Sequence, residues 1–294
     1  MYFKDYLLAL VTAVLWGGNF IATKYGIDGF GVFGLSLIRV TLVSILFFPY
    51  LKFEKQSFKQ IIKIALVHGV GFIIFINISI KYTDNFPLII ILVQTVTPIG
   101  AILSYFYFKE KIALHDFVGM CIAFVGVIIL VGVPKNFISL FSIIAVLISA
   151  FSQAWQMVLI KKYAKEMDTK NLLGWIHLLN IPFFFLLFLV FEDFSLDFMK
   201  ERNAYNWIGA LYVGVASAAI GFGIWLNLLK KYSVNKVAPF MLFVPFFGIL
   251  FSVLFFDSKL TQNVIIGGTL IIVGVSIIQF WSYIKSKNKL TQPL

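Results

Sequence analysis

The chain has 294 residues, of which 61% are hydrophobic and 13% charged, and its formal net charge is +11. Soluble domains are about 45–50% apolar and about 25% charged, so a soluble enzyme, a disordered chain and a secreted disulfide scaffold are excluded. Cys121 is the only cysteine, which excludes intrachain disulfides and paired-cysteine metal sites.

Ten apolar stretches follow one another along the chain, each close to the roughly 20 residues that cross a bilayer as a helix. The expected spans are 6–25, 31–51, 61–81, 86–108, 113–132, 140–161, 171–191, 205–229, 236–256 and 264–284. Their apolar residues run continuously instead of alternating, which favours helices over barrel strands. The connections are short, so the sequence predicts an all-α integral membrane protein without a soluble domain.

The basic residues predict the orientation of these spans. With the N-terminus in the cytoplasm, most of the 24 lysines and arginines fall on the cytoplasmic side, including the lysine-rich segments 52–63 and 161–170. This asymmetry is typical of cytoplasmic loops. It predicts a multi-pass protein of the cytoplasmic (inner) cell membrane with both termini in the cytoplasm. It also assigns the positive charge to lipid head groups, so no nucleic-acid partner is expected.

An internal repeat divides the chain. The pattern Asn-x-x-x-Lys-Tyr-Ser/Thr-x-Asn occurs at 77–85 and again at 227–235. Further matches in the same order are Pro98 before Glu110 and Pro245 before Asp257, and Gly119 before Gly126 and Gly267 before Gly274. We therefore expect two repeats of five helices, 1–135 and 136–294. Because five is odd, the second repeat should be inverted in the membrane, an architecture of many secondary transporters.

Several segments resemble one known family over nearly the whole chain. They include Trp16-Gly17-Gly18-Asn19-Phe20, Leu92-Val93-Gln94, Ala150-Phe151-Ser152-Gln153-Ala154-Trp155, Gly221-Phe222-Gly223-Ile224-Trp225 and Val237-Ala238-Pro239-Phe240-Met241. These segments resemble the EamA family of drug/metabolite transporters, and particularly its bacterial exporters of cysteine and O-acetylserine. The resemblance implies a ten-helix carrier of metabolites, built from two five-helix repeats, which is not an enzyme.

Acidic residues are expected only in loops or at helix ends, although the chain has 13 of them. A carrier for organic cations, or an antiporter driven by a carboxylate, is expected to hold an Asp or Glu inside the membrane. The small multidrug carriers of the same superfamily depend on a glutamate in helix 1, and helix 1 here has none. The sequence therefore favours neutral or zwitterionic substrates over cationic drugs.

Polar residues and tryptophans on helix faces are the candidate substrate-binding residues. Helix 1 places Thr12, Trp16, Asn19 and Thr23 on one face. The full candidate set is Trp16, Asn19, His68, Gln94, Trp155, Gln156 and Trp225. The alternatives are interhelical hydrogen bonds and close packing. We expect helices 1, 3 and 4, more than helix 2, to line the cavity, and we expect the 34 phenylalanines to face lipid or pack.

Four residues have two interpretations each. Arg39, the only charged residue well inside a predicted span, could anchor an anionic group of the substrate or could be structural, capped by carbonyls or snorkelling to the interface. His68 could pass a proton or could simply pack. Pro98 and Pro245 interrupt equivalent helices and could act in gating or be static kinks.

These observations predict a secondary transporter of small neutral or zwitterionic metabolites, with amino acids or their derivatives favoured as substrates, working by alternating access. The resemblance favours export, while uptake and exchange stay open. A rival class, a lipid-modifying membrane enzyme, would need an acid/base, nucleophile or metal cluster, and a membrane scaffold is a further alternative. We expect no cofactor and no metal. The expected partners are a small-molecule substrate and the lipid bilayer, and a homo-oligomer is not required.

Overall fold

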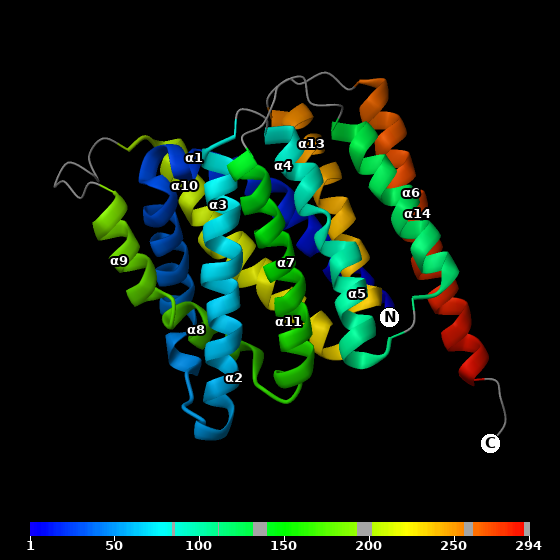
Figure 1. Cartoon of the computed structure of the whole chain (residues 1–294), viewed down its shortest axis with the longest axis horizontal. Helices are drawn as coiled ribbons and strands as arrows, with labels where there is room; N and C mark the ends of the chain where they lie inside the picture. The colour runs from blue at the N-terminus through cyan, green and yellow to red at the C-terminus, as the bar shows by residue number, and fades with distance from the viewer. Residues whose placement is uncertain (84–85, 111, 132–139, 193–201, 256–260, 291–294) are drawn as a thin grey trace.

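A computed structural model describes residues 1–83, 86–110, 112–131, 140–192, 202–255 and 261–290. These residues are almost entirely helical and contain no strand, and Figure 1 shows the helices gathered into one bundle. The all-α prediction is therefore confirmed. The helices are α1 (Phe3–Phe47), η1 (Phe48–Tyr50), α2 (Lys55–Leu66), η2 (Val67–Ile74), α3 (Phe75–Lys81), α4 (Phe86–Val93), α5 (Val96–Phe108), α6 (Leu114–Val131), α7 (Leu140–Tyr163), α8 (Thr169–Leu178), α9 (Ile181–Phe191), α10 (Ala204–Leu211), η4 (Tyr212–Gly221), α11 (Phe222–Lys231), α12 (Val234–Val237), η5 (Ala238–Phe243), α13 (Val244–Phe255) and α14 (Gln262–Leu290).

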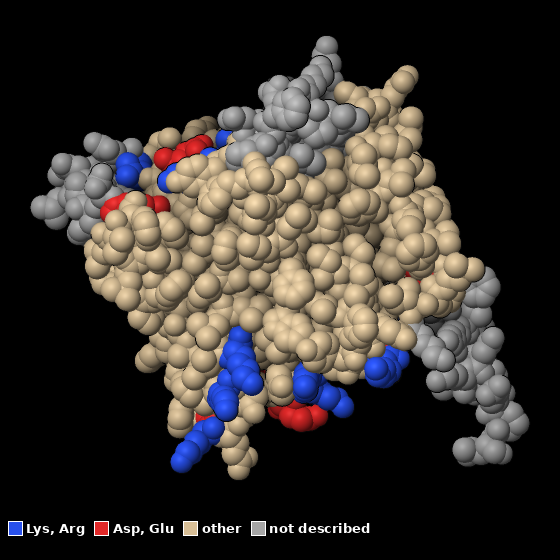
Figure 2. Space-filling view, viewed as in Figure 1, with Lys and Arg blue, Asp and Glu red and all other residues tan. Residues whose placement is uncertain are grey.

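Seven helical stretches in the described chain are long and apolar enough to cross a membrane. The first of them, Phe3–Tyr50, covers both of the first two predicted spans, and the fifth and tenth predicted spans correspond to the shorter apolar helices Leu114–Leu130 and Gln262–Ile278. Figure 2 shows a broad band of uncharged surface, with most of the visible lysines and arginines along the lower edge and a smaller group of basic and acidic residues at the upper left. This is the surface of a multi-pass membrane protein.

The first two predicted spans join without a loop. The sequence predicted a connection over 26–30, but α1 continues through it and breaks only at Gly31, where φ is 74° and ψ is −179°. Glu192 covers the break: Phe33 N donates to its Oε1 at 2.9 Å and Gly34 N to its Oε2 at 2.7 Å. A carboxylate stabilises the unpaired N–H groups that begin a helix, so Glu192 caps the second limb of α1.

Helices α6 and α14 pack side by side at one edge of the bundle (Figure 1). A Cβ placed at Gly119 would lie 2.7 Å from Gly274 O, and one placed at Gly126 would lie 2.8 Å from Gly267 O. Glycine pairs of this kind let two helix backbones touch directly. Since the earlier glycine of one helix faces the later glycine of the other, α6 and α14 run antiparallel.

Irregular helical segments occur at matching places around the centre of the bundle. Segments η2 and η4 are π-helical and lead into α3 and α11, respectively. A turn at Gln94–Thr95 separates α4 from α5, and the 3-10 segment η5 separates α12 from α13. Pro98 and Pro245 each lie in the first turn of the helix that follows the break, where a missing N–H leaves no hydrogen bond unmade. Breaks of this kind expose backbone near the interior and are frequent at functional sites.

Candidate functional site

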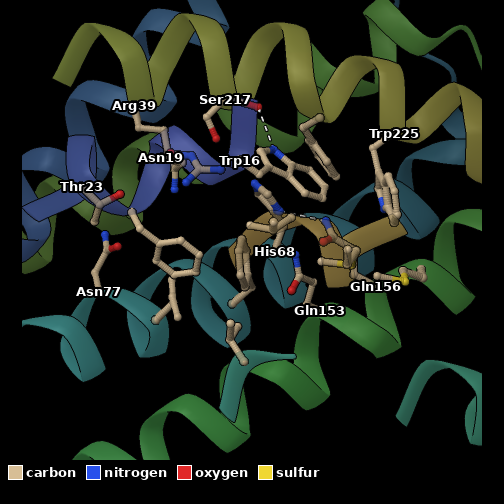
Figure 3. Close-up of a pocket in the computed structure, with 18 of the residues that line it drawn as sticks. Trp16, Asn19, Thr23, Arg39, His68, Asn77, Gln153, Gln156, Ser217 and Trp225 are labelled. Carbon is tan, nitrogen blue, oxygen red and sulfur yellow. Dashed lines mark hydrogen bonds between the residues drawn. The ribbon is translucent and has the colours of Figure 1, made fainter. Parts of the chain in front are cut away.

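A cavity with an empty volume of about 850 Å³ lies in the middle of the bundle. Its polar lining residues are Asn19, Thr23, Arg39, His68, Asn77, Gln94, Gln153, Gln156 and Ser217. They come from both halves of the sequence, and Figure 3 shows most of these side chains converging on one space.

Six of the seven predicted substrate-binding residues border this cavity: Trp16, Asn19, His68, Gln94, Gln156 and Trp225. Substrate binding by these residues stays a prediction. Trp155 is the exception among the described residues, because its ring instead packs edge-on against Tyr107 at a centroid distance of 4.9 Å. Successive residues on a helix point about 100° apart, and here Gln156 points toward the cavity while Trp155 points toward Tyr107.

Several lining residues lie outside the seven candidates. Thr23 and Gln153 lie on the polar faces that it identified, and Asn77 begins the first copy of the repeat motif, so these three carried a signal. Phe20, Phe72 and Phe222 also line the cavity, which corrects the expectation that phenylalanines only pack or face lipid.

Arg39 also corrects an expectation, because it lines the cavity from the second limb of α1, which is predicted helix 2. Its side chain is 6% exposed, and Nε has no hydrogen-bond partner in the described structure. Within the described ranges Arg39 makes no ion pair with an acidic residue, which is costly for a buried charge. A ligand that brings a negative group would offset this cost.

Four further cavity residues have a buried polar atom without a partner in the part of the chain described. They are Asn19 (Oδ1), His68 (Nε2), Gln94 (Oε1) and Gln153 (Oε1). Leaving one such atom unsatisfied costs about 1–3 kcal/mol. Such groups therefore normally bond to water or to a ligand, and here all four residues line the cavity.

His68 is held rigidly at the cavity wall. Its Nδ1 lies 2.9 Å from Gln156 Nε2, and its ring stacks on Phe222 at 4.7 Å with an interplanar angle of 8°. The ring of His177 lies 5.1 Å away, and His177 Nδ1 lies 2.9 Å from Leu173 O. These contacts connect the cavity to α8.

Two tryptophans form an aromatic wall. The Trp16 and Trp225 rings lie 5.1 Å apart at an angle of 54°. Trp16 Nε1 donates a hydrogen bond to Ser217 O at 3.3 Å, which connects α1 to η4. The indole edge of Trp16 is thereby occupied, and aromatic ring faces remain available for an apolar group.

Comparison with known proteins identifies the family. The model of the EamA-like transporter family matches residues 4–132 and 140–280. The chain belongs to the EamA-like transporter family. It is 27% identical over 284 residues to a probable amino-acid metabolite efflux pump of Salmonella typhimurium, covering 93% of this chain and 94% of that protein. The Escherichia coli protein of the same name is 26% identical with the same coverage.

Two further likenesses agree with this membership. An uncharacterized transporter of Bacillus subtilis, YoaV, is 25% identical over 281 residues, covering 92% of this chain and 94% of that protein. A known crystal structure superposes with a TM-score of 0.79 at 14% identity, covering 95% of this chain and 98% of its own, and this shows the fold alone. The protein is thus a membrane transporter and not an enzyme, and its bacterial relatives indicate the cell membrane.

Proposed function

We propose that the protein carries small zwitterionic metabolites, amino acids or their close derivatives, across the cytoplasmic membrane, with export favoured. The observation that carries this proposal is the central cavity, whose buried donors and acceptors have no protein partner in the described chain. Such groups suit a polar, hydrogen-bonding substrate. The names of the Salmonella typhimurium and Escherichia coli relatives support an amino-acid metabolite and efflux, while uptake or exchange would be an outcome of the flux test.

The mechanism that we propose is alternating access between two inverted five-helix repeats, 1–135 and 136–294. Ten spans with both termini in the cytoplasm complete the proposed topology. The antiparallel pair of α6 and α14 supports it, because these are the last helices of the two repeats. The π-helical segments η2 and η4 at corresponding places support it as well. Pro98 and Pro245, beside the two broken helices, are the proposed gating positions.

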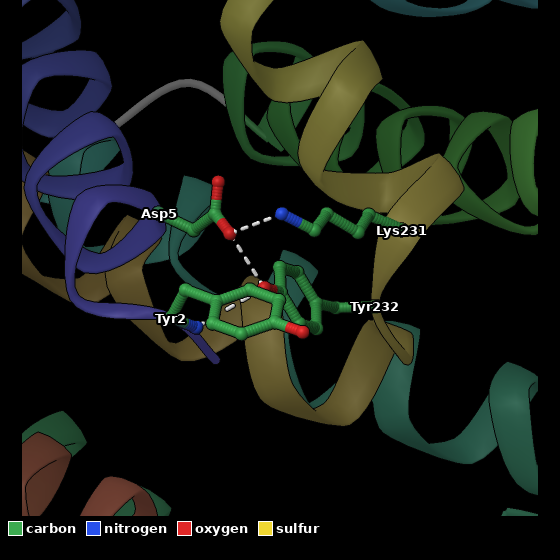
Figure 4. Close-up of polar contacts among 4 residues, drawn as sticks. All are labelled: Tyr2, Asp5, Lys231 and Tyr232. Carbon is green, nitrogen blue, oxygen red and sulfur yellow. Dashed lines mark hydrogen bonds and ion pairs between the residues drawn. The ribbon is translucent and has the colours of Figure 1, made fainter.

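A polar contact joins the start of α1 to the end of α11 (Figure 4). Asp5 Oδ2 accepts hydrogen bonds from Lys231 Nζ and from the Tyr232 hydroxyl, both at 2.5 Å, and Tyr2 N donates to that hydroxyl at 3.1 Å. Burial, followed by the bond to Asp5, raises the pKa of Tyr232, so its hydroxyl keeps the proton that it donates. We propose that this contact closes the cytoplasmic end.

The other copy of the repeat motif makes a corresponding contact. Ser142 Oγ, at the start of α7, donates to Tyr82 O, at the end of α3, at 2.7 Å. In both contacts the first helix of one repeat is hydrogen-bonded to the Lys-Tyr pair of the repeat motif in the other repeat. Alternating access requires closures at opposite ends that open in turn, and this pair of contacts has the required arrangement.

The test of the proposed function is flux in proteoliposomes against radiolabelled amino acids, nucleosides and sugars. We expect amino acids to equilibrate across the membrane. Asn19→Ala and Gln94→Ala should each weaken the apparent affinity for the transported amino acid about 2- to 12-fold, because each removes one hydrogen bond worth about 0.5–1.5 kcal/mol. Gln262→Ala, at the exposed start of α14, is the matched control. Unchanged transport in both cavity variants would place the site elsewhere, and flux of sugars or nucleosides alone would contradict the substrate class.

A second prediction concerns the contact at Asp5. In a Cys121→Ser background, Leu229→Cys places a thiol on the cavity wall, two residues before Lys231. Asp5→Asn removes the charge that holds Lys231, so we expect faster modification of that thiol by a membrane-impermeant reagent from the cytoplasmic side. Glu54→Gln, at an exposed carboxylate of the described chain, should not change the rate. Equal rates of thiol modification with and without Asp5→Asn would show that this contact does not close the cytoplasmic end.

A further inference from the structure

We propose that the cavity selects α-amino acids with a large apolar or aromatic side chain. In this proposal the carboxylate binds at Arg39 and the side chain packs against Trp16 and Trp225. The inference rests on the proposed function and makes the substrate class more specific. It follows from how charge, hydrogen-bonding groups and aromatic rings are distributed around the cavity.

The charge of the cavity calls for a carboxylate. Arg39 is buried, lines the cavity and makes no ion pair in the described ranges of the chain, and the described lining residues include no Asp or Glu. A guanidinium pairs with a carboxylate through two parallel hydrogen bonds. A substrate that has an amine but no carboxylate would leave this charge buried without compensation.

His68 supplies a second donor. Gln156 Nε2 is an amide nitrogen that can only donate, so the Nδ1 atom that lies 2.9 Å from it is the acceptor. A neutral imidazole that accepts at one nitrogen carries its proton on the other. His68 Nε2 is therefore a donor, and it has no partner among the described residues.

Three acceptors complete the set. The amide oxygens of Asn19, Gln94 and Gln153 are buried at the cavity and lack donors within the described chain. An ammonium group donates to such acceptors, and a carboxylate accepts from the two donors. An amino acid therefore offers partners to both kinds of atom, whereas an amine or a carboxylate alone complements only one kind.

The other end of the cavity combines aromatic and apolar side chains with Gln156. Figure 3 shows Arg39 and Asn19 at one end and Trp225 at the other, with Trp16 and His68 between them. Met157 and Phe222 add to the lining. A large apolar side chain gains by covering aromatic surface, whereas a short polar side chain leaves that surface uncovered.

The first experiment uses the unmodified protein and needs no variant. In proteoliposomes, uptake of labelled L-phenylalanine is competed with L-phenylalaninamide, which lacks the carboxylate, with 3-phenylpropionate, which lacks the amine, and with L-serine, which lacks the apolar side chain. We expect unlabelled L-phenylalanine to compete about tenfold or more better than each of the three. Equal competition by the amide, or stronger competition by L-serine, would overturn the inference.

Variants then assign the two ends of the cavity. Arg39→Gln should abolish the preference for phenylalanine over its amide, and Arg39→Lys should retain part of it. Trp225→Ala should weaken phenylalanine binding more than serine binding, while Trp155→Phe, outside the cavity, should change neither. A preference for phenylalanine over its amide that survives Arg39→Gln would overturn the assignment of the carboxylate. If no amino acid is transported at all, the proposed function itself fails, whereas transport that favours small polar amino acids overturns only this inference.

Discussion

Gly267→Ala should pull α6 away from α14 and sharply lower the yield of folded protein. A Cβ at position 267 would lie 2.5 Å from Leu130 N and 2.6 Å from Gly126 O. Both are backbone atoms, so no rotamer change can make room and the helices must separate. Overpacking typically lowers the free energy of unfolding by about 1–3 kcal/mol. Because the atoms in the way belong to the backbone of α6, we expect this substitution to lie at the upper end of that range.

Gly100→Ala is the matched control for that experiment. The nearest atom to a Cβ at position 100 would be Val234 Cγ1 at 3.6 Å, which is ordinary contact. Alanine is about 0.8–1.0 kcal/mol more favourable than glycine inside a helix, so the melting temperature should stay or rise. Thermal unfolding followed by size-exclusion chromatography in detergent distinguishes the two. Equal melting temperatures for both variants would mean that α6 and α14 are not packed through their glycines.

Polar positions were the part of the site that the sequence could predict. A polar side chain at helical spacing in an apolar segment is conspicuous, and Trp16, Asn19, Gln94 and Gln156 were found in this way. Trp155 does not border the cavity, and the reason is geometric. Tryptophan suits a lipid interface, an aromatic cluster or a cavity, so its position beside Gln156 did not determine which way it points.

The apolar residues that line the cavity were not predictable, because the solvent around a membrane protein is lipid. In a membrane protein the exterior is as apolar as the core, so Phe20, Phe72 and Phe222 resemble lipid-facing phenylalanines in every local respect. Arg39 was identified as unusual, but its contact with the cavity depends on the angle between the two parts of α1 on either side of Gly31. That angle depends on a tertiary contact between Gly31 and Glu192, which are far apart in the sequence.

The breaks in the helices were likewise predictable from the sequence in some places and not in others. Pro98 and Pro245 marked two interrupted helices correctly. The π-helical segments η2 and η4 contain no proline, so no proline marks these two breaks in the sequence.

Gly31→Ala should lower both stability and substrate affinity. At φ of 74° an alanine is strained by about 1–2 kcal/mol, and its Cβ would collide with the Glu192 carboxylate. Moving that carboxylate removes the acceptor for Phe33 N and Gly34 N. Asn19 precedes this break and Arg39 follows it, so a change in the angle between the limbs of α1 moves Arg39 relative to the rest of the cavity.

Glu192→Gln separates the two effects of this break. The glutamine keeps the size of the side chain and one acceptor oxygen but loses the charge that stabilises a helix N-terminus, and Gly31 keeps its backbone angles. We therefore expect a smaller drop in melting temperature than for Gly31→Ala, with substrate affinity close to that of the unmodified protein. Melting curves and competition by unlabelled amino acid measure the two quantities on the same preparations. If Gly31→Ala melted normally and transported normally, the turn at Gly31 would not be what positions Arg39 in the cavity.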